Sequence, residues 1–127
     1  NLLLGLPGHP EVVILDMEAG IEHLGRGTAG AVDAFIVVVE PVRRSLDTAA
    51  RIHRLAQDIG VPRFLLVGNK VLGDDDLAFI QVHSDGMPLA GCFPVDERVS
   101  LADREGIPVY DAVPEFVMIA QEIAAQI

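Results

Sequence analysis

An aspartate, Asp16, directly follows a run of four aliphatic residues, Val12 to Leu15, and a glycine, Gly20, comes four positions later. Such an aliphatic run is typical of a strand buried on both faces, so we predict a strand from 11 to 16. A carboxylate at the carboxyl end of a parallel strand lies where open α/β sheets bind ligands, and it can hold a metal ion or its bound waters. The alternative is that Asp16 caps a following helix.

A second candidate for chemistry is the pair Asn69-Lys70, which follows the apolar run from 63 to 68. The amide of Asn69 carries both donors and an acceptor, so it can match the edge of a purine base. The aliphatic stem of Lys70 can lie against a ring or a ribose. Lys70 is the single lysine among nine basic residues, which favours a specific placement. The alternative is an asparagine in a tight turn beside a solvated lysine.

The elements that must position these residues alternate along the chain. This order predicts an α/β fold, with a mostly parallel sheet, helices on both faces and one domain over residues 1–127. Ser45 is the predicted N-cap of the clearest helix, and Gly60 is its predicted stop. We predict strands at 11–16, 34–40, 63–68 and 89–95, and helical segments at 1–6, 21–31, 45–59, 74–82, 100–105 and 114–126.

The carboxyl ends of parallel strands share one edge of a sheet. We therefore expect Asp16, Glu40 and Asn69-Lys70 to converge on one crevice, with Pro94-Val95 from the last strand beside them. This expectation needs only the order of the strands and no finer geometry.

Composition excludes several classes of function. The net charge of −10 disfavours binding to a nucleic-acid backbone, which needs a basic surface. The longest apolar run is far shorter than a membrane span. The single cysteine, Cys92, excludes an internal disulfide, indicates a reducing compartment and is interpreted as structural. The opening Asn-Leu-Leu-Leu, without Met, leads us to expect a piece of a longer protein.

Three motifs stand out when the chain is taken as a whole: Asp16-Met-Glu-Ala-Gly20 with its extension from Glu22 to Gly27, Glu40-Pro41 followed by Arg44-Ser45, and Gly68-Asn69-Lys70. Together they resemble the deviant-P-loop ATPases, the superfamily of septum-site and plasmid-partition proteins and of the nitrogenase iron protein. The extension, like Pro94-Val95-Asp96, is similar to the branch that matures carbon monoxide dehydrogenase by nickel insertion.

The resemblance implies roles for individual residues. Asp16 would be the switch-loop acid that reaches Mg²⁺ through water, and Gly20 would respond to the γ-phosphate of ATP. Asn69-Lys70 would contact the adenine nucleotide, and Pro94-Val95 would border the base pocket. The phosphate-binding loop of the family, and the Cys-x-Cys pair that would hold nickel or zinc, precede the matched region. We therefore expect the chain alone to lack ATPase activity and that metal site.

The function implied is that of a cytoplasmic nucleotide switch. A homodimer would bind ATP, hydrolyse it to ADP and assist nickel insertion into carbon monoxide dehydrogenase as its client, with neither nucleic acid nor membrane as partner. One alternative is a partition or cell-division positioning ATPase of the same superfamily. The segment from 116 to 127 contains no Lys or Arg, which disfavours that alternative. The other is a non-enzymatic α/β interaction module.

One further prediction concerns the sheet. In the resembled family the phosphate-loop strand lies between the strand that ends at Asp16 and the strand from 34 to 40. Without it, the backbone groups of both strands need another partner. We predict either direct pairing of Val12–Leu15 with Phe35–Val39, or contact with another chain through these edges.

Overall fold

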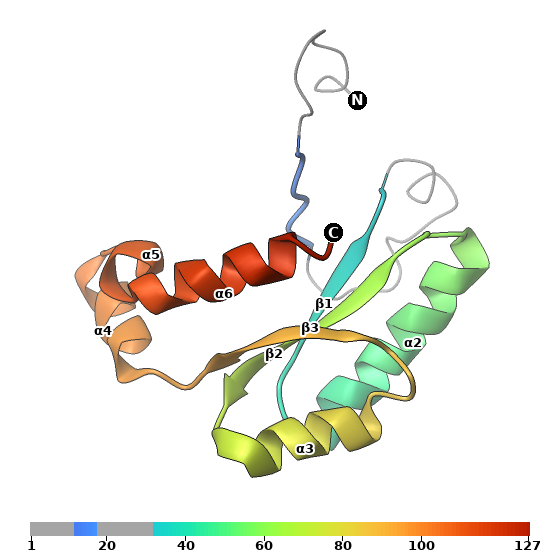
Figure 1. Ribbon diagram of the computed structural model, residues 1–127, viewed down its shortest axis with the longest axis horizontal. Coiled ribbons are helices and arrows are strands. Elements are labelled where there is room, and N and C mark those ends of the chain that lie inside the picture. The colour runs from blue at the N-terminus through green and yellow to red at the C-terminus, as the bar shows by residue number, and fades with distance from the viewer. Residues whose placement is uncertain (1–11, 18–31) are drawn as a thin grey trace, which may run out of the picture.

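The computed structural model describes residues 12–17 and 32–127. Three parallel strands form one sheet in the order β1-β2-β3, with helices between and after them (Figure 1). The predicted α/β fold with a parallel sheet is therefore confirmed. The strands are β1 (Phe35–Val39), β2 (Phe64–Val71) and β3 (Leu89–Pro94); the helices are α2 (Arg43–Ile59), α3 (Gly73–His83), α4 (Glu97–Glu105), α5 (Val109–Ala112) and α6 (Pro114–Ala124).

Helices cover both faces of the sheet, and two glycines show how closely they approach. A Cβ atom added to Gly68 of β2 would lie 3.1 Å from Ile80 Cδ1 of α3. One added to Gly91 of β3 would lie 2.9 Å from Ile123 Cγ1 of α6. Since Gly68 pairs with Cys92, the neighbouring Gly91 faces the opposite side of the sheet. The sheet thus lies between α2 and α3 on one face and α6 on the other (Figure 1).

The main core lies between the sheet and the first two helices. Buried side chains recur every three or four positions along α2, which is the spacing that keeps them on one face of a helix. Leu66 at the centre of β2 and Ile80 of α3 are fully buried against this stripe. The buried residues of α2 are Leu46, Ala49, Ile52 and Ala56.

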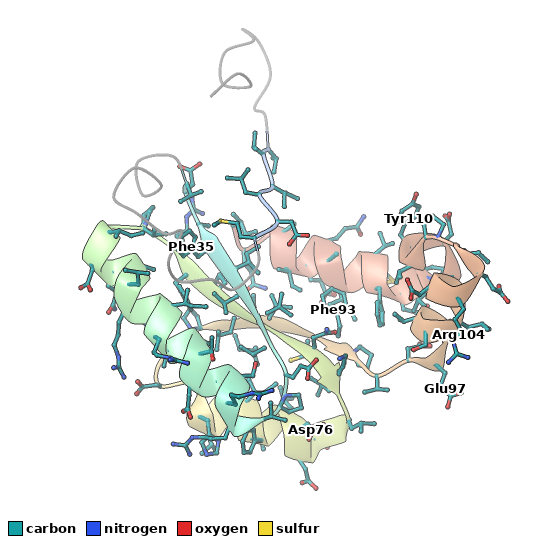
Figure 2. The ribbon with its side chains drawn as sticks, turned by 180° about the vertical axis from the view of Figure 1, so that it is seen from behind. Phe35, Asp76, Phe93, Glu97, Arg104 and Tyr110 are labelled. Carbon is teal, nitrogen blue, oxygen red and sulfur yellow. The ribbon has the colours of Figure 1, made fainter. Side chains whose placement is uncertain are left out.

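The other face carries a smaller contact. Phe93 of β3 points toward α6, where its ring meets Phe116 edge-on at 5.1 Å between centroids (Figure 2). This aromatic pair and the contact between Gly91 and Ile123 hold α6 on the sheet.

Two helix starts differ from the prediction. Helix α2 begins at Arg43, so Ser45 lies inside its first turn rather than at its N-cap. The Ser45 hydroxyl accepts a hydrogen bond from the Glu40 backbone N–H at 3.0 Å and thereby holds the preceding turn. The predicted stop is confirmed, because Gly60 adopts the left-handed conformation (φ 80°) and its N–H bonds the carbonyls of Ala56 and Gln57.

Helix α4 begins at Glu97, three residues before the predicted start at Ser100. The Asp96 carboxylate accepts a hydrogen bond from the Arg98 backbone N–H at 2.9 Å, which makes Asp96 the N-cap. The short helix α5 was not predicted. Its four residues follow Pro108, and they provide too little periodicity for a sequence pattern to reveal.

The strand predicted over 11–16 is wrong for its described part. Residues 12–16 form no regular structure, and Val12 and Ile14 are each 86% exposed. They do not pair with β1, whose only neighbour in the described sheet is β2. A strand needs a hydrogen-bonded neighbour, and among the described residues none lies beside this segment.

The face of β1 opposite α2 is also exposed. Ile36 is 44% exposed and Val38 is 59% exposed, whereas Val39 on the α2 side is buried. Direct pairing with Val12–Leu15 is thus excluded in this structure, while contact with another chain stays a prediction. The helical segments predicted at 1–6 and 21–31, and Gly20, lie outside the described residues.

Candidate functional site

The carboxyl edge of the sheet brings together residues that the sequence placed there. Val39 of β1 lies opposite Gly68 of β2, so the next residues of the two strands emerge side by side. The Lys70 ammonium donates a hydrogen bond to Glu40 Oε1 at 2.6 Å. Convergence of the β1 and β2 ends is therefore observed, and it takes the form of an ion pair.

The backbone of β2 is irregular at this point. Gly68 pairs with Cys92 and Val71 pairs with Pro94, so β2 has one residue more than β3 between these pairs. Such a bulge re-aims the side chains next to it and is frequent beside functional sites. Lys70 within it has φ 55°, a left-handed conformation that residues with a Cβ seldom adopt.

Asn69 is half-buried in the same bulge. Among the residues that the structure describes, no hydrogen bond involves its side chain. The end of β3 lies alongside, because the Val95 N–H donates to the Val71 carbonyl at 3.2 Å. Asn69-Lys70 and Pro94-Val95 therefore share one edge.

Asp16 is placed less firmly. It is exposed in the irregular segment 12–17, and no hydrogen bond or ion pair to another described residue involves it. Its side chain is exposed, and no contact joins it to Asn69 among the described residues. Gly20, the other residue expected to act near phosphate, lies outside the described residues.

An ionic cluster that the sequence did not reveal follows β3. The Arg98 guanidinium forms bonds of 2.7–3.1 Å with both carboxylate oxygens of Asp96 and a bond of 3.3 Å with Glu115 of α6. Bonding to the side chain and then the backbone of Arg98 lowers the pKa of Asp96. The pKa of Glu115 is lowered by its own backbone N–H and then by Arg98. Arg98 therefore ties the start of α4 to the start of α6.

This cluster predicts a dependence of stability on pH. Because both carboxyl pKa values are lowered in the folded state, their stabilisation is present above the unfolded-state values and is lost as pH falls. We expect Arg98→Met to lower the melting temperature at neutral pH and to lose less than the wild type between about pH 5 and pH 3. Thermal unfolding followed by circular dichroism measures both effects.

Arg104→Met is the matched control, because Arg104 lies on the same helix and has no ion pair within the described residues (Figure 2). It should leave the acid dependence unchanged. Parallel pH profiles for the wild type and Arg98→Met would contradict the assignment.

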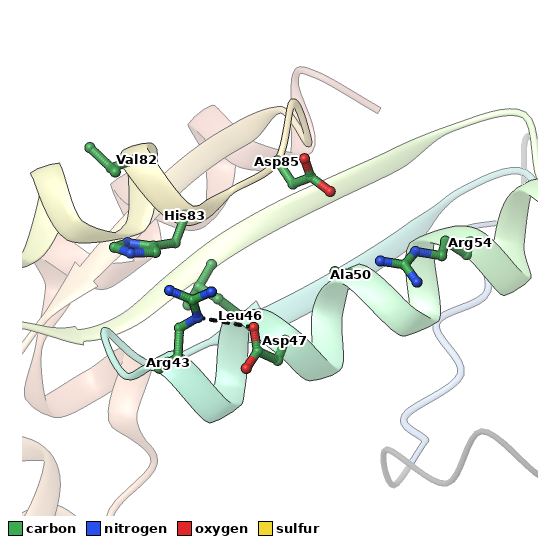
Figure 3. Close-up of a pocket in the computed structure, with 8 residues that line it drawn as sticks. All are labelled: Arg43, Leu46, Asp47, Ala50, Arg54, Val82, His83 and Asp85. Atoms are coloured by element: carbon green, nitrogen blue, oxygen red, sulfur yellow. Dashed lines mark hydrogen bonds and ion pairs between the residues drawn. The ribbon is translucent and has the colours of Figure 1, made fainter.

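A separate groove of about 320 Å³ lies between α2 and the C-terminal end of α3 (Figure 3). Arg43 and Asp47 on its wall form an ion pair at 3.2 Å, and His83 is held by the Phe79 carbonyl at 2.8 Å. None of the residues expected to bind nucleotide lines this groove. We therefore place the candidate site at the carboxyl edge of the sheet.

The described residues contain neither a cluster of metal ligands nor a membrane-spanning helix. Within 12–17 and 32–127, no group of three His, Cys, Asp or Glu side chains is placed to hold a metal ion. No helix in that same part of the chain has the length and apolarity needed to span a membrane. Cys92 lies in β3, where burial raises the pKa of its thiol, in keeping with a structural role.

The sequence of this chain is similar to the sequences of several known proteins. No family model matches the chain. The carbon monoxide dehydrogenase accessory protein CooC of Rhodospirillum rubrum is 45% identical over 104 residues, which are 82% of this chain and 40% of that protein. Over that span the chain is a homologue of this accessory protein. The resemblance drawn from the motifs is thereby confirmed.

Two further proteins also match this chain. Two uncharacterised ATP-binding proteins of Methanocaldococcus jannaschii are 42% and 36% identical, over 78% and 83% of this chain and 39% and 42% of their own lengths. The chain thus spans about two fifths of the length of the curated relatives it matches. The matched spans make up 78–83% of this chain.

Sequence reasoning missed one ion pair at this site and one residue near it. It placed Glu40 on the edge but did not pair it with Lys70, although opposite charges at the ends of neighbouring strands were a usable signal. It did not single out Arg98, whose partner Glu115 is seventeen positions away and reaches it only through the packing of α6.

Proposed function

We propose that this chain is the C-terminal part of an ATP-binding, ATP-hydrolysing switch that assists nickel insertion into carbon monoxide dehydrogenase. The observation that carries the proposal is the position of Asn69, half-buried on a bulge at the carboxyl edge of a parallel sheet. Homology to a carbon monoxide dehydrogenase accessory protein and to ATP-binding proteins supports it. In this proposal ATP binding closes a homodimer and hydrolysis reopens it.

Each residue of the edge has a role in this proposal. The Asn69 amide reads the adenine edge, the Lys70 stem lies beside the nucleoside, and Pro94-Val95 forms one wall of the base pocket. The phosphates extend toward Asp16, and the sequence that binds them belongs to the longer parent protein. Such a division is consistent with the share of the relatives' length that the chain covers.

Asp16 suits a magnesium ion bound with ATP. Its carboxylate is an exposed oxygen donor, and Mg²⁺ takes only one or two protein carboxylates because it retains several waters. When bound, the ion would neutralise charge on the phosphates during transfer. The chain's own contribution is to hold one carboxylate where those waters lie.

The base assignment is tested by Asn69→Ala in the parent protein. We expect the preference for ATP over GTP to fall by about 1–3 kcal/mol, since the substitution leaves a buried base edge without its partner. Titration of the protein with each nucleotide by calorimetry gives the two dissociation constants.

Gln81→Ala provides the control, because it removes an exposed amide from α3 and should leave the preference unchanged. The assignment of Asn69 fails if the ratio of the two constants is the same in Asn69→Ala and the wild type. If the parent protein binds neither nucleotide, the proposed function itself fails.

A further inference from the structure

The Glu40–Lys70 ion pair joins two irregular backbone segments at the candidate site. Glu40 directly follows β1, and its N–H donates a hydrogen bond to the Ser45 hydroxyl at 3.0 Å. Lys70 lies in the bulge of β2, next to Asn69. The 2.6 Å contact between the two side chains therefore links the turn that leads into α2 to the segment that presents Asn69.

The ion pair can stabilise the unusual backbone conformation of Lys70. Its φ of 55° is one that a glycine adopts freely but that a side chain with a Cβ resists. The side chains of Lys70 and Glu40 are 65% and 46% exposed, so their attraction is modest. The cost of this conformation is also modest, which puts the ion pair on the scale needed to hold the bulge.

In the described part of the structure, neither another ion pair nor strand pairing with β3 holds Lys70 in this conformation. Lys70 is the only lysine of the chain, and Glu40 is its one ion-pair partner among the described residues. Gly68 and Val71 of β2 pair with β3, but the two residues between them, Asn69 and Lys70, do not. Strand pairing with β3 therefore does not fix Asn69-Lys70.

We propose that Glu40 is a positioning residue for nucleotide selectivity: by binding Lys70 it fixes the left-handed bulge that aims Asn69 at the base. This inference rests on the proposed function above. Glu40 itself does not touch the nucleotide, and its effect passes through the backbone at Lys70. The specificity of the site would then depend on a residue from the neighbouring strand.

The test is a double-mutant cycle in the parent protein, with Glu40→Gln and Lys70→Gly. Glycine tolerates the left-handed conformation without help, so it removes the need for the ion pair. We expect Glu40→Gln alone to reduce the ratio of GTP to ATP dissociation constants by about threefold to tenfold. In the Lys70→Gly background the same substitution should change that ratio by less than about twofold.

Nucleotide selectivity is the deciding measurement, because simple loss of stability lowers the folded fraction without changing the ratio of two constants. Asp47→Asn is the matched control, since it removes an exposed carboxylate whose ion pair with Arg43 lies within α2 and does not involve Lys70. An equal effect of Glu40→Gln in both backgrounds, or no effect in either, overturns the positioning role. If those results come from a protein whose selectivity still responds to Asn69→Ala, the proposed function survives.

Discussion

In the parent protein, Asp16→Asn should leave ATP affinity nearly unchanged and slow hydrolysis by about a hundredfold, equivalent to about 2.7 kcal/mol in the barrier. The substitution keeps the size of the side chain and removes the charge that we assign to the water shell of Mg²⁺. The adenine contacts that we propose for β2 and β3 would be untouched, so we expect binding to persist. Phosphate release under saturating ATP, together with a separate binding titration, measures the two effects.

The control for this experiment is Asp58→Asn, which removes an exposed carboxylate near the C-terminal end of α2. It should hydrolyse ATP at the wild-type rate. Unchanged turnover in Asp16→Asn would remove Asp16 from the mechanism, whereas loss of binding would assign it to affinity rather than to hydrolysis.

The largest effect on stability should come from Leu66→Ala. Leu66 is fully buried at the centre of β2, between the stripe of α2 and Ile80 of α3. Deleting its side chain removes apolar burial and leaves a cavity, so we expect a loss of about 2–5 kcal/mol in the free energy of unfolding. Urea unfolding measures this loss from the shift of the midpoint at constant slope.

Val38→Ala serves as the comparison, because Val38 is on the central sheet but is 59% exposed on the outer face of β1. It should change the free energy of unfolding by no more than about 0.5 kcal/mol. Similar losses in the two variants would show that the outer face of β1 is covered in solution.

The three observed strands and α2 were predictable because their patterns are strong. Aliphatic runs ending at Val39 and at Gly68, and an apolar segment before Pro94, indicate buried parallel strands. The apolar residues from Leu46 to Ala56 follow helical spacing over several turns. The sharing of one edge by the ends of β1, β2 and β3 then follows from their direction alone. These parts of the fold depend on local sequence and need little information about packing.

The remaining features depend on contacts that a pattern does not contain. Helix starts were misplaced because Ser45 and Ser100 are good capping residues, whereas Val42 and Asp96 take the N-cap positions. The bulge in β2 arises because β2 has one residue more than β3 between two paired positions, and this register cannot be read from the sequence of β2 alone. The strand expected at Val12–Leu15 has the right composition, but composition does not supply a hydrogen-bonded neighbour.

The open side of β1 has a consequence for any strand that is to lie next to it. The five residues of β1 pair with β2 along one edge, and no described strand pairs with the other edge. Ile36 and Val38 project from the face of β1 opposite α2 and are largely exposed. A strand that paired with the open edge along its whole length would be about five residues long. Apolar side chains on the face it shares with Ile36 and Val38 would extend the apolar surface that those two residues begin.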